Sequence, residues 1–328
     1  MIKRFALAAI AAAAVVTTGM AQADEFKPAI VFDMGGKFDK SFNEAAYNGA
    51  EAFKKDTGID YMEFEVTQVS QREQAMKRMA RKGASIIVAM GFAQASAVEK
   101  AAKEFPDTKF TIVDMVVDLP NVQSIIFKEH EGSFLVGMAA ALTSKTGKVG
   151  FVGGMDIPLI RKFALGYVEG AKYANPNAEV FQNMTGTTPA AWNDPTKGGE
   201  LAKSQFDRGA DVVYAAAGGT GIGVYQAAKD AGKFAIGVDS NQNYLHPGTM
   251  LTSMTKGVDV AVMEAFANAK AGTWQPGIKV LGLKEGGVNY ALDEHNKGVL
   301  SQEVIDKLEA ARADIIAGKI KVTDYMAQ

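Results

Sequence analysis

The chain has 328 residues, a formal net charge of −2 and no cysteine. The near-neutral charge argues against a nucleic-acid-binding surface, which is normally basic. The lack of cysteine excludes disulfides, thiolate metal sites and lipid attachment through an N-terminal cysteine.

The N-terminal residues predict a secretory signal peptide over 1–23. Lys3 and Arg4 precede an apolar stretch at 5–16, and small residues at 21–23 resemble a cleavage site. The apolar stretch is short for a membrane span, and loss of the two basic residues would take the net charge from −2 to −4. We therefore expect an exported periplasmic protein without a lipid anchor, whose mature chain begins at Asp24.

Short β-branched segments alternate with amphipathic helical segments in the first part of the mature chain. The expected strands lie at 30–33, 61–66, 85–90, 110–113 and 122–127. The expected helices between them lie at 41–55, 71–82 and 94–104. Several of these strands are apolar throughout, as in sheets covered on both faces. The βαβα order therefore predicts a parallel sheet with helices on both sides.

The same alternation begins again after residue 127. Further strands are expected at 148–152, 179–183, 211–216 and 234–238, and further helices at 132–144, 160–173, 198–206 and 221–230. The last segments, at 250–253, 258–271, 278–283, 288–291 and 303–317, are too few for a third lobe.

The fold class expected from this order is α/β, with two Rossmann-like lobes and three crossings between them. Crossings near Phe127, Pro247 and Gly277 fit this order, and glycine and proline flank two of them. The first lobe would then consist of 24–127 and 248–277. The second lobe would consist of 128–247 and 278–328.

Aspartates follow three of the expected strands. Asp33, Asp114 and Asp239 each come directly after an apolar run, and open α/β sheets bind ligands at the carboxyl ends of their strands. One such aspartate is ordinary turn chemistry, but three in equivalent positions of two lobes indicate a ligand site. Carboxylates only accept hydrogen bonds, so they suit hydroxyl and ring N–H groups.

Other candidate binding residues lie in polar segments near these strands. Asp39 fits a helix cap and a ligand contact equally well. Phe42, just inside a helix start, suits core packing, but the neighbouring carboxylates favour stacking on a ligand. Trp192 lies in a polar loop, which also favours binding. The segment at 29–44 contains no obvious nucleophile–base pair, so it favours binding over catalysis.

Two other patterns do not match known site motifs. The glycine-rich segment at 218–223 follows a strand and opens a helix, but it lacks both the dinucleotide and the phosphate-loop spacing. The remaining interpretation is that the backbone of this segment closely approaches a neutral ligand. The histidines, His130, His246 and His295, lie far apart without metal-ligand spacing, and we expect neither a metal nor a cofactor.

One motif resembles the signature of a known family. Asp39-Lys40-Ser41-Phe42-Asn43, after a strand that ends in Asp33, resembles the basic-membrane-protein family, also called the purine-nucleoside-receptor-like family. Further matches at 131–137, 148–154, 237–239 and 252–256 extend the resemblance over nearly the whole mature chain. It implies the type I periplasmic-binding fold and the function of a substrate-binding protein that delivers its ligand to the membrane permease of an ABC importer.

The resemblance also implies a purine nucleoside in the cleft, with its base between two aromatic rings. Phe42 matches the ring of the first lobe, and Trp192 aligns best with the ring of the second. By the same resemblance, the polar contacts of the first lobe are Asp33, Asp39 and Asp114. The ribose-binding pair corresponds to Asp239 and Lys256, and Gly219 corresponds to a glycine whose backbone faces the sugar. By itself, Lys256 is more typical of a solvated helix start.

We therefore expect a monomeric binding protein, not an enzyme, that closes on a purine nucleoside or base. Two alternatives remain open. A sugar-binding protein of the same fold is one, because free sugars also stack on aromatic rings. An exported nucleoside hydrolase is the other, although its metal-assisted chemistry would need carboxylates clustered on one lobe.

Overall fold

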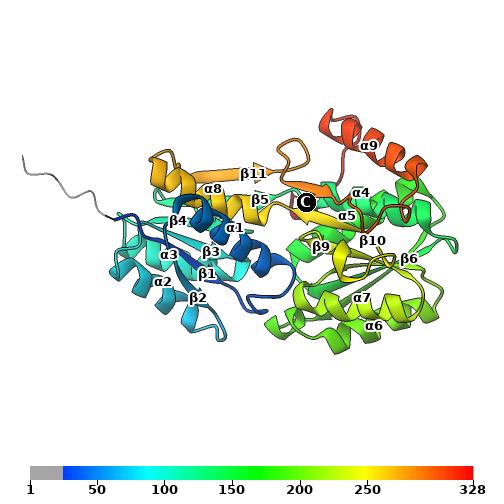
Figure 1. The fold of residues 1–328 in the computed structure, drawn as a ribbon, viewed down its shortest axis with the longest axis horizontal. Helices are drawn as coiled ribbons and strands as arrows, with labels where there is room; N and C mark the ends of the chain where they lie inside the picture. Colours follow the sequence, from blue (N-terminus) through cyan, green and yellow to red (C-terminus); the bar gives the residue numbers. More distant parts are fainter. Residues whose placement is uncertain (1–24, 328) are drawn as a thin grey trace, which may run out of the picture.

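The computed structural model describes residues 25–327. Within that range the chain forms two α/β lobes that lie side by side (Figure 1). The expected signal peptide at 1–23 and the expected mature start at Asp24 lie outside the described residues. No helix of the described part is both long enough and apolar enough to cross a membrane.

The first lobe contains, among residues 25–327, a six-stranded sheet in the order β11-β5-β4-β3-β1-β2. All neighbouring strands in it are parallel. Its strands are β1 (Pro28–Phe32), β2 (Met62–Glu65), β3 (Ile86–Met90), β4 (Lys109–Val113), β5 (Val122–Phe127) and β11 (Gly277–Leu281). Its helices are α1 (Phe42–Thr57), α2 (Gln71–Arg81), α3 (Ala95–Glu104) and α8 (Val258–Ala271).

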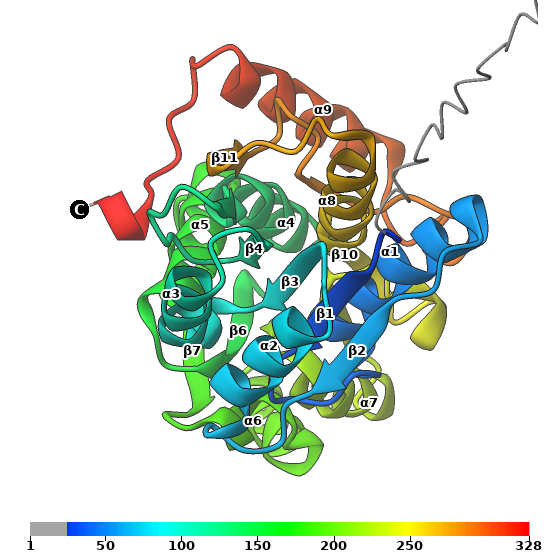
Figure 2. The same cartoon turned by 90° about the vertical axis from the view of Figure 1, so that its left-hand side faces the viewer.

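Helices cover both faces of this first sheet, with α2 and α3 on one side and α1 and α8 on the other (Figure 2). Successive side chains of β1 point to opposite faces. Ile30 and Phe32 pack in the core that contains α1 and α8, whereas Ala29 and Val31 pack against α2 and α3. Burial on both faces explains why β1 is apolar at every position instead of alternating with polar residues.

The second lobe also has a six-stranded sheet in the described range, in the order β12-β10-β9-β8-β6-β7. Only its edge pair, β10 with β12, is antiparallel. Its strands are β6 (Lys148–Met155), β7 (Glu179–Gly186), β8 (Val212–Ala216), β9 (Phe234–Asp239), β10 (Met250–Lys256) and β12 (Val288–Tyr290). Its helices are α4 (Glu129–Thr143), α5 (Pro158–Ala174), α6 (Pro195–Asp207), α7 (Gly221–Asp230) and α9 (Gln302–Ile316).

Helices α4 and α5 approach each other closely. A Cβ atom on Gly137 of α4 would overlap the backbone of Tyr167, and one on Gly170 of α5 would overlap the backbone of Phe134. Glycine is required at both positions because a bare backbone leaves room for the facing helix. This packing places the start of α4, where the chain enters the second lobe, against α5.

The chain crosses between the lobes three times within residues 25–327, so the predicted fold of two Rossmann-like lobes with three crossings is confirmed. It enters the second lobe after β5, returns to the first lobe after β10 and leaves it again after β11. The first crossing agrees with the position predicted near Phe127.

The other two crossings differ from the prediction, which assigned 248–277 to the first lobe and 278–328 to the second. Strand β10 instead pairs with β9 and β12 in the second sheet, and β11 pairs with β5 in the first. Pro247 lies in the turn between β9 and β10, where the N–H of Thr249 donates to the carbonyl of His246. Proline and glycine favour turns within a lobe as well as between lobes, so they could not locate these crossings.

Candidate functional site

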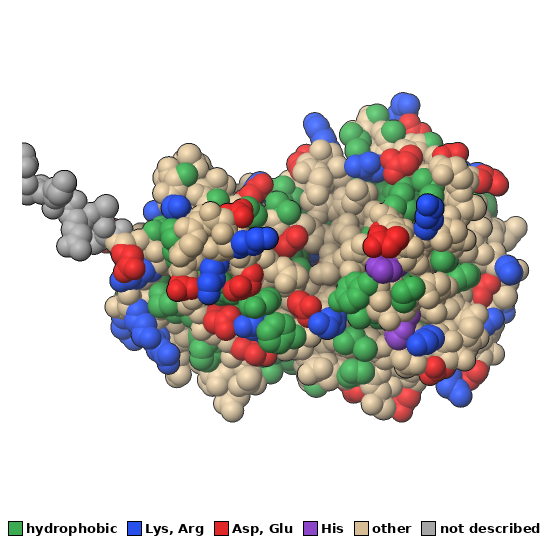
Figure 3. Space-filling view, in the orientation of Figure 1, with side chains coloured by type: hydrophobic (Ala, Val, Ile, Leu, Met, Phe, Trp, Pro, Cys, Tyr) green, Lys and Arg blue, Asp and Glu red, His purple; other side chains and the backbone are tan. Residues whose placement is uncertain are grey.

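A cavity lies between the lobes, where the carboxyl ends of strands from both sheets face each other. The surface is hollowed between the lobes, and acidic and basic side chains are interspersed over the face drawn in Figure 3. The space between the atoms that line the cavity, counted with its open mouth, is about 630 Å³. A crevice outside the carboxyl ends of the strands is where open α/β sheets bind their ligands.

The structure brings together seven of the eight site residues predicted from the sequence. The residues that line the cavity are Asp33, Asp39, Phe42, Asp114, Trp192, Asp239 and Lys256. The eighth, Gly219, is buried beside the cavity, and its neighbour Gly218 lines the wall instead. Gly218 has a positive φ of 56°, and it begins the short 3-10 helix Gly218–Thr220 that turns Gly219 toward the backbone of Trp192.

Two of the strand-end aspartates have an uncommon backbone conformation. Asp114, directly after β4, has a φ of 70°, and Asp239, the last residue of β9, has a φ of 63°. Residues other than glycine seldom adopt this left-handed region, and its strain collects at functional sites. In both residues the turn holds a buried carboxylate at the cavity.

Lys256 supplies a buried cation in the cavity. Its Nζ lies 2.7 Å from Oδ2 of Asp114 and 3.2 Å from Oε1 of Glu129. It also lies 5.2 Å from the ring centroid of Phe42 and 5.7 Å from that of Phe163. A buried ammonium group needs such partners because its desolvation is costly. Since β10 belongs to the second lobe and β4 to the first, the pair with Asp114 joins the two lobes.

The protonation of the cavity groups reflects their burial. Burial raises the pKa of Asp39 to about 7 and the pKa of Asp114 to about 6. It also raises the pKa of Asp33 and of Asp239, although nearby cations oppose both shifts. Burial by itself would lower the pKa of Lys256, but the surrounding carboxylates together raise it above its usual value.

Asp39 forms the cap at the start of α1. Its carboxylate accepts hydrogen bonds from the backbone N–H groups of Ser41 at 2.8 Å, Asn43 at 3.1 Å and Glu44 at 3.1 Å. Helix N-termini leave such donors without partners inside the helix. Asp39 therefore has the capping role that the sequence left open, and it lines the cavity as well.

The start of α1 also contacts the second lobe directly. The hydroxyl of Ser41 donates to Oδ2 of Asp239 at 2.5 Å, and the hydroxyl of Ser240 donates to the carbonyl of Ser41 at 3.2 Å. Nε2 of Gln242 donates to the carbonyl of Lys40 at 2.9 Å. These contacts join the lobes at the edge of the cavity, so the structure is that of a closed cleft.

Asp33 is fixed by a partner on a helix. Nε and Nη2 of Arg72 on α2 both lie near Oδ1 of Asp33, at 3.1 and 2.8 Å. This arrangement leaves the second carboxylate oxygen, Oδ2, available on the cavity side, next to Gly91. The ion pair thus holds an acceptor in a fixed orientation at the wall.

Trp192 ends the 3-10 helix Pro189–Trp192. Its ring lies directly over the backbone of Gly154 on β6, where any Cβ atom would overlap it. Its Cβ is 3.3 Å from where a Cβ would stand on Gly35 in the first lobe. The tryptophan is therefore held between the two lobes, with part of its surface at the cavity.

Sequence reasoning missed several residues around the cavity. Arg72, Glu129 and Phe163 all lie on helices, where neither strand ends nor motif spacing point to them. Of these three residues, Glu129 has the strongest sequence signal, because it follows the predicted crossing at Phe127 by two residues. Apolar side chains that line the cavity and were not predicted are Met34, Phe92, Leu159, Ile160, Phe163, Ala216, Ala217 and Val238.

The cavity combines two kinds of wall. Aromatic and aliphatic side chains, among them Phe42 and Trp192, form the apolar part. Asp114, Asp239 and Lys256 provide hydrogen-bond acceptors and one strong donor. Such a site suits a small ligand with a flat apolar face and several hydroxyl groups.

Comparisons with known proteins agree with this geometry. A family model described as "ABC transporter substrate-binding protein PnrA-like" matches residues 26–325. The "ABC transporter nucleoside-binding protein BmpA" of Lactococcus lactis is 35% identical, over 93% of this chain and 91% of the relative. "Basic membrane protein A" of Borreliella afzelii is 32% identical, over 90% of this chain and 91% of the relative.

A solved structure extends the comparison to the fold. The crystal structure of an ABC transporter solute-binding protein from Aeropyrum pernix K1 is 30% identical in sequence, with a TM-score of 0.82. The similarity covers 90% of this chain and 93% of that one. The predicted type I periplasmic-binding fold is confirmed.

The comparisons correct the predicted localisation. A relative from Pyrococcus horikoshii, 37% identical over 82% of this chain and 69% of the relative, is named an uncharacterized lipoprotein. A Pyrococcus abyssi relative, 35% identical, has the same kind of name. These names contradict the prediction of a periplasmic protein without a lipid anchor. That prediction rested on a leader-like N-terminus and on the lack of cysteine, which do not establish where the mature protein resides.

Proposed function

The chain belongs to the PnrA-like family of ABC transporter substrate-binding proteins, and we propose that it captures a purine nucleoside or purine base in the cavity between its lobes. The family match confirms the resemblance seen in the motif at 39–43. Proteins of this kind bind a small ligand and work with the membrane permease of an ABC importer. Family membership does not specify the ligand, and its assignment to the purine class is our proposal.

The observation that carries the proposal is the division of the cavity into an aromatic part and a polar part. A purine nucleoside is divided in the same way, into a flat base and a ribose with hydroxyl groups. Phe42 and Trp192 would stack on the base, and each ring would contribute roughly 0.5–1.5 kcal/mol beyond the area it buries. Asp33, with its free oxygen, would accept a hydrogen bond from a ring N–H.

The polar part suits the ribose. Asp239 and Asp114 would accept hydrogen bonds from ribose hydroxyls, and the ammonium group of Lys256 would donate to a ribose oxygen. Asp39 lies at the same wall and completes the set of polar contacts that we propose. The name of the Lactococcus lactis relative, a nucleoside-binding protein, supports the same ligand class.

The apolar wall favours a purine over a free sugar. Met34, Phe92, Leu159 and Phe163 add to the aromatic surface of Phe42. A monosaccharide has hydroxyl groups around its whole ring, and this wall would leave those on one side without partners. We also propose that the ligand leaves chemically unchanged, as the role of a substrate-binding protein requires.

Thermal melting of purified protein, refolded after denaturation to remove any carried ligand, tests the proposal. Inosine, guanosine and adenosine should raise the melting temperature by mass action, whereas ribose and glucose should have little effect. Chromatography of the recovered ligand should show intact nucleoside. A larger shift with sugars would favour the sugar-binding alternative, and release of free base at a catalytic rate would favour a hydrolase.

A further inference from the structure

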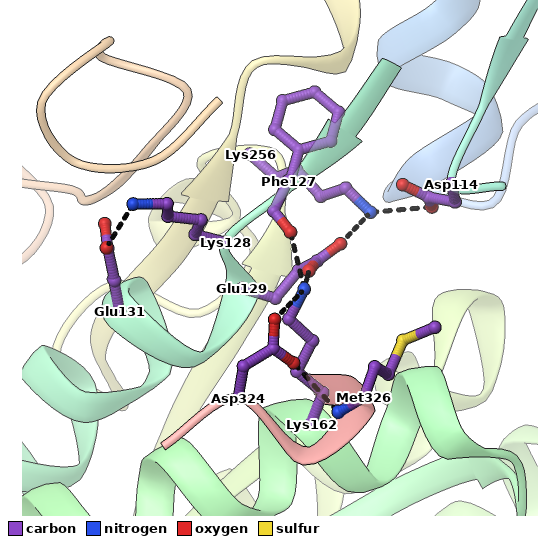
Figure 4. Close-up of polar contacts among 9 residues, drawn as sticks. All are labelled: Asp114, Phe127, Lys128, Glu129, Glu131, Lys162, Lys256, Asp324 and Met326. Carbon is purple, nitrogen blue, oxygen red and sulfur yellow. Dashed lines mark hydrogen bonds and ion pairs between the residues drawn. The ribbon is translucent and has the colours of Figure 1, made fainter. Parts of the chain in front are cut away.

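A row of alternating charges extends from the cavity to the C-terminal segment (Figure 4). Lys256, already paired with Asp114, lies 3.2 Å from Oε1 of Glu129. Oε2 of Glu129 lies 3.1 Å from Nζ of Lys162, and this Nζ lies 3.5 Å from Oδ2 of Asp324. Glu129 is therefore shared by two lysines, and Lys162 by two carboxylates.

The middle of this row is shielded from water. The side chains of Glu129, Lys162 and Lys256 are 1%, 6% and 2% exposed, whereas that of Asp324 is 31% exposed. Charges in such surroundings are weakly screened, so each one depends on its neighbours. A change of charge at Asp324 would therefore be felt by the buried ions next to it.

The row passes through the first crossing between the lobes. Nζ of Lys162 also donates to the carbonyl of Phe127, the last residue of β5, at 2.8 Å. Glu129 begins α4 two residues later. The same cation thus holds both the crossing segment and the carboxylate that reaches the cavity lysine.

Two hydrogen bonds besides the Lys162–Asp324 pair hold the C-terminal segment, one to α5 and one within the segment. The N–H of Thr323 donates to Oε2 of Glu169 on α5 at 2.9 Å. Oδ1 of Asp324 accepts from the N–H of Met326 at 2.9 Å, in the short 3-10 helix Tyr325–Ala327. These hydrogen bonds orient Asp324 so that its other oxygen, Oδ2, faces Lys162.

We propose that Asp324 is a positioning residue for ligand binding, which acts through Lys162 and Glu129 on the ammonium group of Lys256. With Asp324 in place, Lys162 is balanced by two carboxylates, and Glu129 holds Lys256 at the cavity. Without that charge, Lys162 attracts Glu129 more strongly, and Lys256 moves toward Asp114. The inference rests on the proposed function, in which Lys256 contacts the ligand.

The test compares the Asp324→Asn and Asp314→Asn variants of the full chain. Asparagine at 324 keeps the size of the side chain and an oxygen for the N–H of Met326. Asp314 is the matched control, because its carboxylate pairs with Lys319 at 2.9 Å in an exposed position. Both substitutions change the net charge equally. An Asp324→Glu variant restores the charge.

Two readouts are measured for each variant. Calorimetric titration with inosine should show binding about threefold to tenfold weaker in Asp324→Asn, no change in Asp314→Asn and partial recovery in Asp324→Glu. In unliganded protein labelled with ¹³C-lysine, the side-chain signals of Lys256, assigned by their loss in Lys256→Arg, should shift only in Asp324→Asn.

The proposal is overturned if Asp324→Asn binds inosine like wild type, if the Lys256 signals do not move, or if Asp314→Asn has the same effects. Failure of the wild-type protein to bind inosine, guanosine and adenosine contradicts the proposed function instead. In that case the Lys256 signals, which require no ligand, still decide whether Asp324 acts on the cavity lysine.

Discussion

The ammonium group of Lys256, at the end of β10 in the second lobe, lies 2.7 Å from the carboxylate of Asp114, which follows β4 in the first. This buried ion pair joins the two lobes inside the cavity that we assign to the ligand. It places a positive charge where carboxylates would otherwise repel one another. The closed cleft therefore depends on Lys256 even before a ligand enters.

Replacement of Lys256 tests this dependence. Lys256→Met keeps most of the side-chain volume but leaves the carboxylates of Asp114 and Glu129 without their shared cation. Removing one partner of a buried pair costs roughly 3–5 kcal/mol, so urea unfolding of the unliganded variant should show a loss of that size.

The exposed lysine of the Lys197–Glu200 pair provides the control. Lys197→Met should change stability by less than about 1 kcal/mol. Equal effects of the two variants would contradict the account.

The buried carboxyl of Asp39 predicts a pH dependence of stability. Burial raises the pKa of Asp39 to about 7 in the folded protein, from 3.8. Between these values the folded state holds a proton that the unfolded state has lost, so the contribution of Asp39 to stability falls as pH rises. Above the folded pKa the full penalty of the buried charge is present.

Asp39→Asn removes this titration and keeps an oxygen that can accept from the start of α1. Relative to this variant, the wild-type protein should lose stability between about pH 4 and about pH 7, the interval between the unfolded and the folded pKa of Asp39, by up to about 1.4 kcal/mol for each unit of pKa shift. Urea unfolding of the two unliganded proteins across this range measures the difference. A difference that does not change with pH would show that Asp39 is not titrating there.

Phe42 is predicted to act on the base and not on the ribose. Phe42→Ala should weaken inosine and hypoxanthine alike, because both contain the base; stacking on an aromatic side chain contributes roughly 1–3 kcal/mol, about fivefold to more than a hundredfold in affinity. Phe38, which is 59% exposed and is not among the residues that line the cavity, is the matched control. Calorimetric titration of both variants makes the comparison. Equal weakening by Phe38→Ala would remove the argument for stacking on Phe42.

Much of the fold could be predicted from hydrophobic patterning. The alternation of apolar strands with amphipathic helices predicted both sheets, because strands buried on two faces are apolar at successive positions. The membership of β10 and β11 could not be predicted in the same way. Lys279 of β11 pairs with Ile125 of β5, far away in the sequence, and either sheet could accept a short strand of this composition.

The candidate site shows the same limit. Asp33, Asp114 and Asp239 were predicted because a strand end has a fixed place in a parallel sheet. Arg72 and Glu129 were not, because their positions depend on how helices pack in three dimensions. Their roles as partners of Asp33 and Lys256 became visible only with the fold.

The central claim is that the polar end of the cavity, around Asp239 and Lys256, binds the ribose of a purine nucleoside. Calorimetric titration of inosine and of hypoxanthine into the wild-type protein and into Asp239→Ala tests it most directly. Inosine carries a ribose and hypoxanthine does not. A lost hydrogen bond to a charged group costs roughly 1.5–3 kcal/mol, about tenfold to a hundredfold in affinity.

Asp239 also accepts a hydrogen bond from Ser41, so the melting temperature of the unliganded variant must be measured alongside to separate binding from folding. The account predicts that Asp239→Ala binds inosine about tenfold to a hundredfold more weakly than wild type and binds hypoxanthine nearly as well. Equal weakening of the two ligands, or no inosine binding by the wild-type protein, would contradict it.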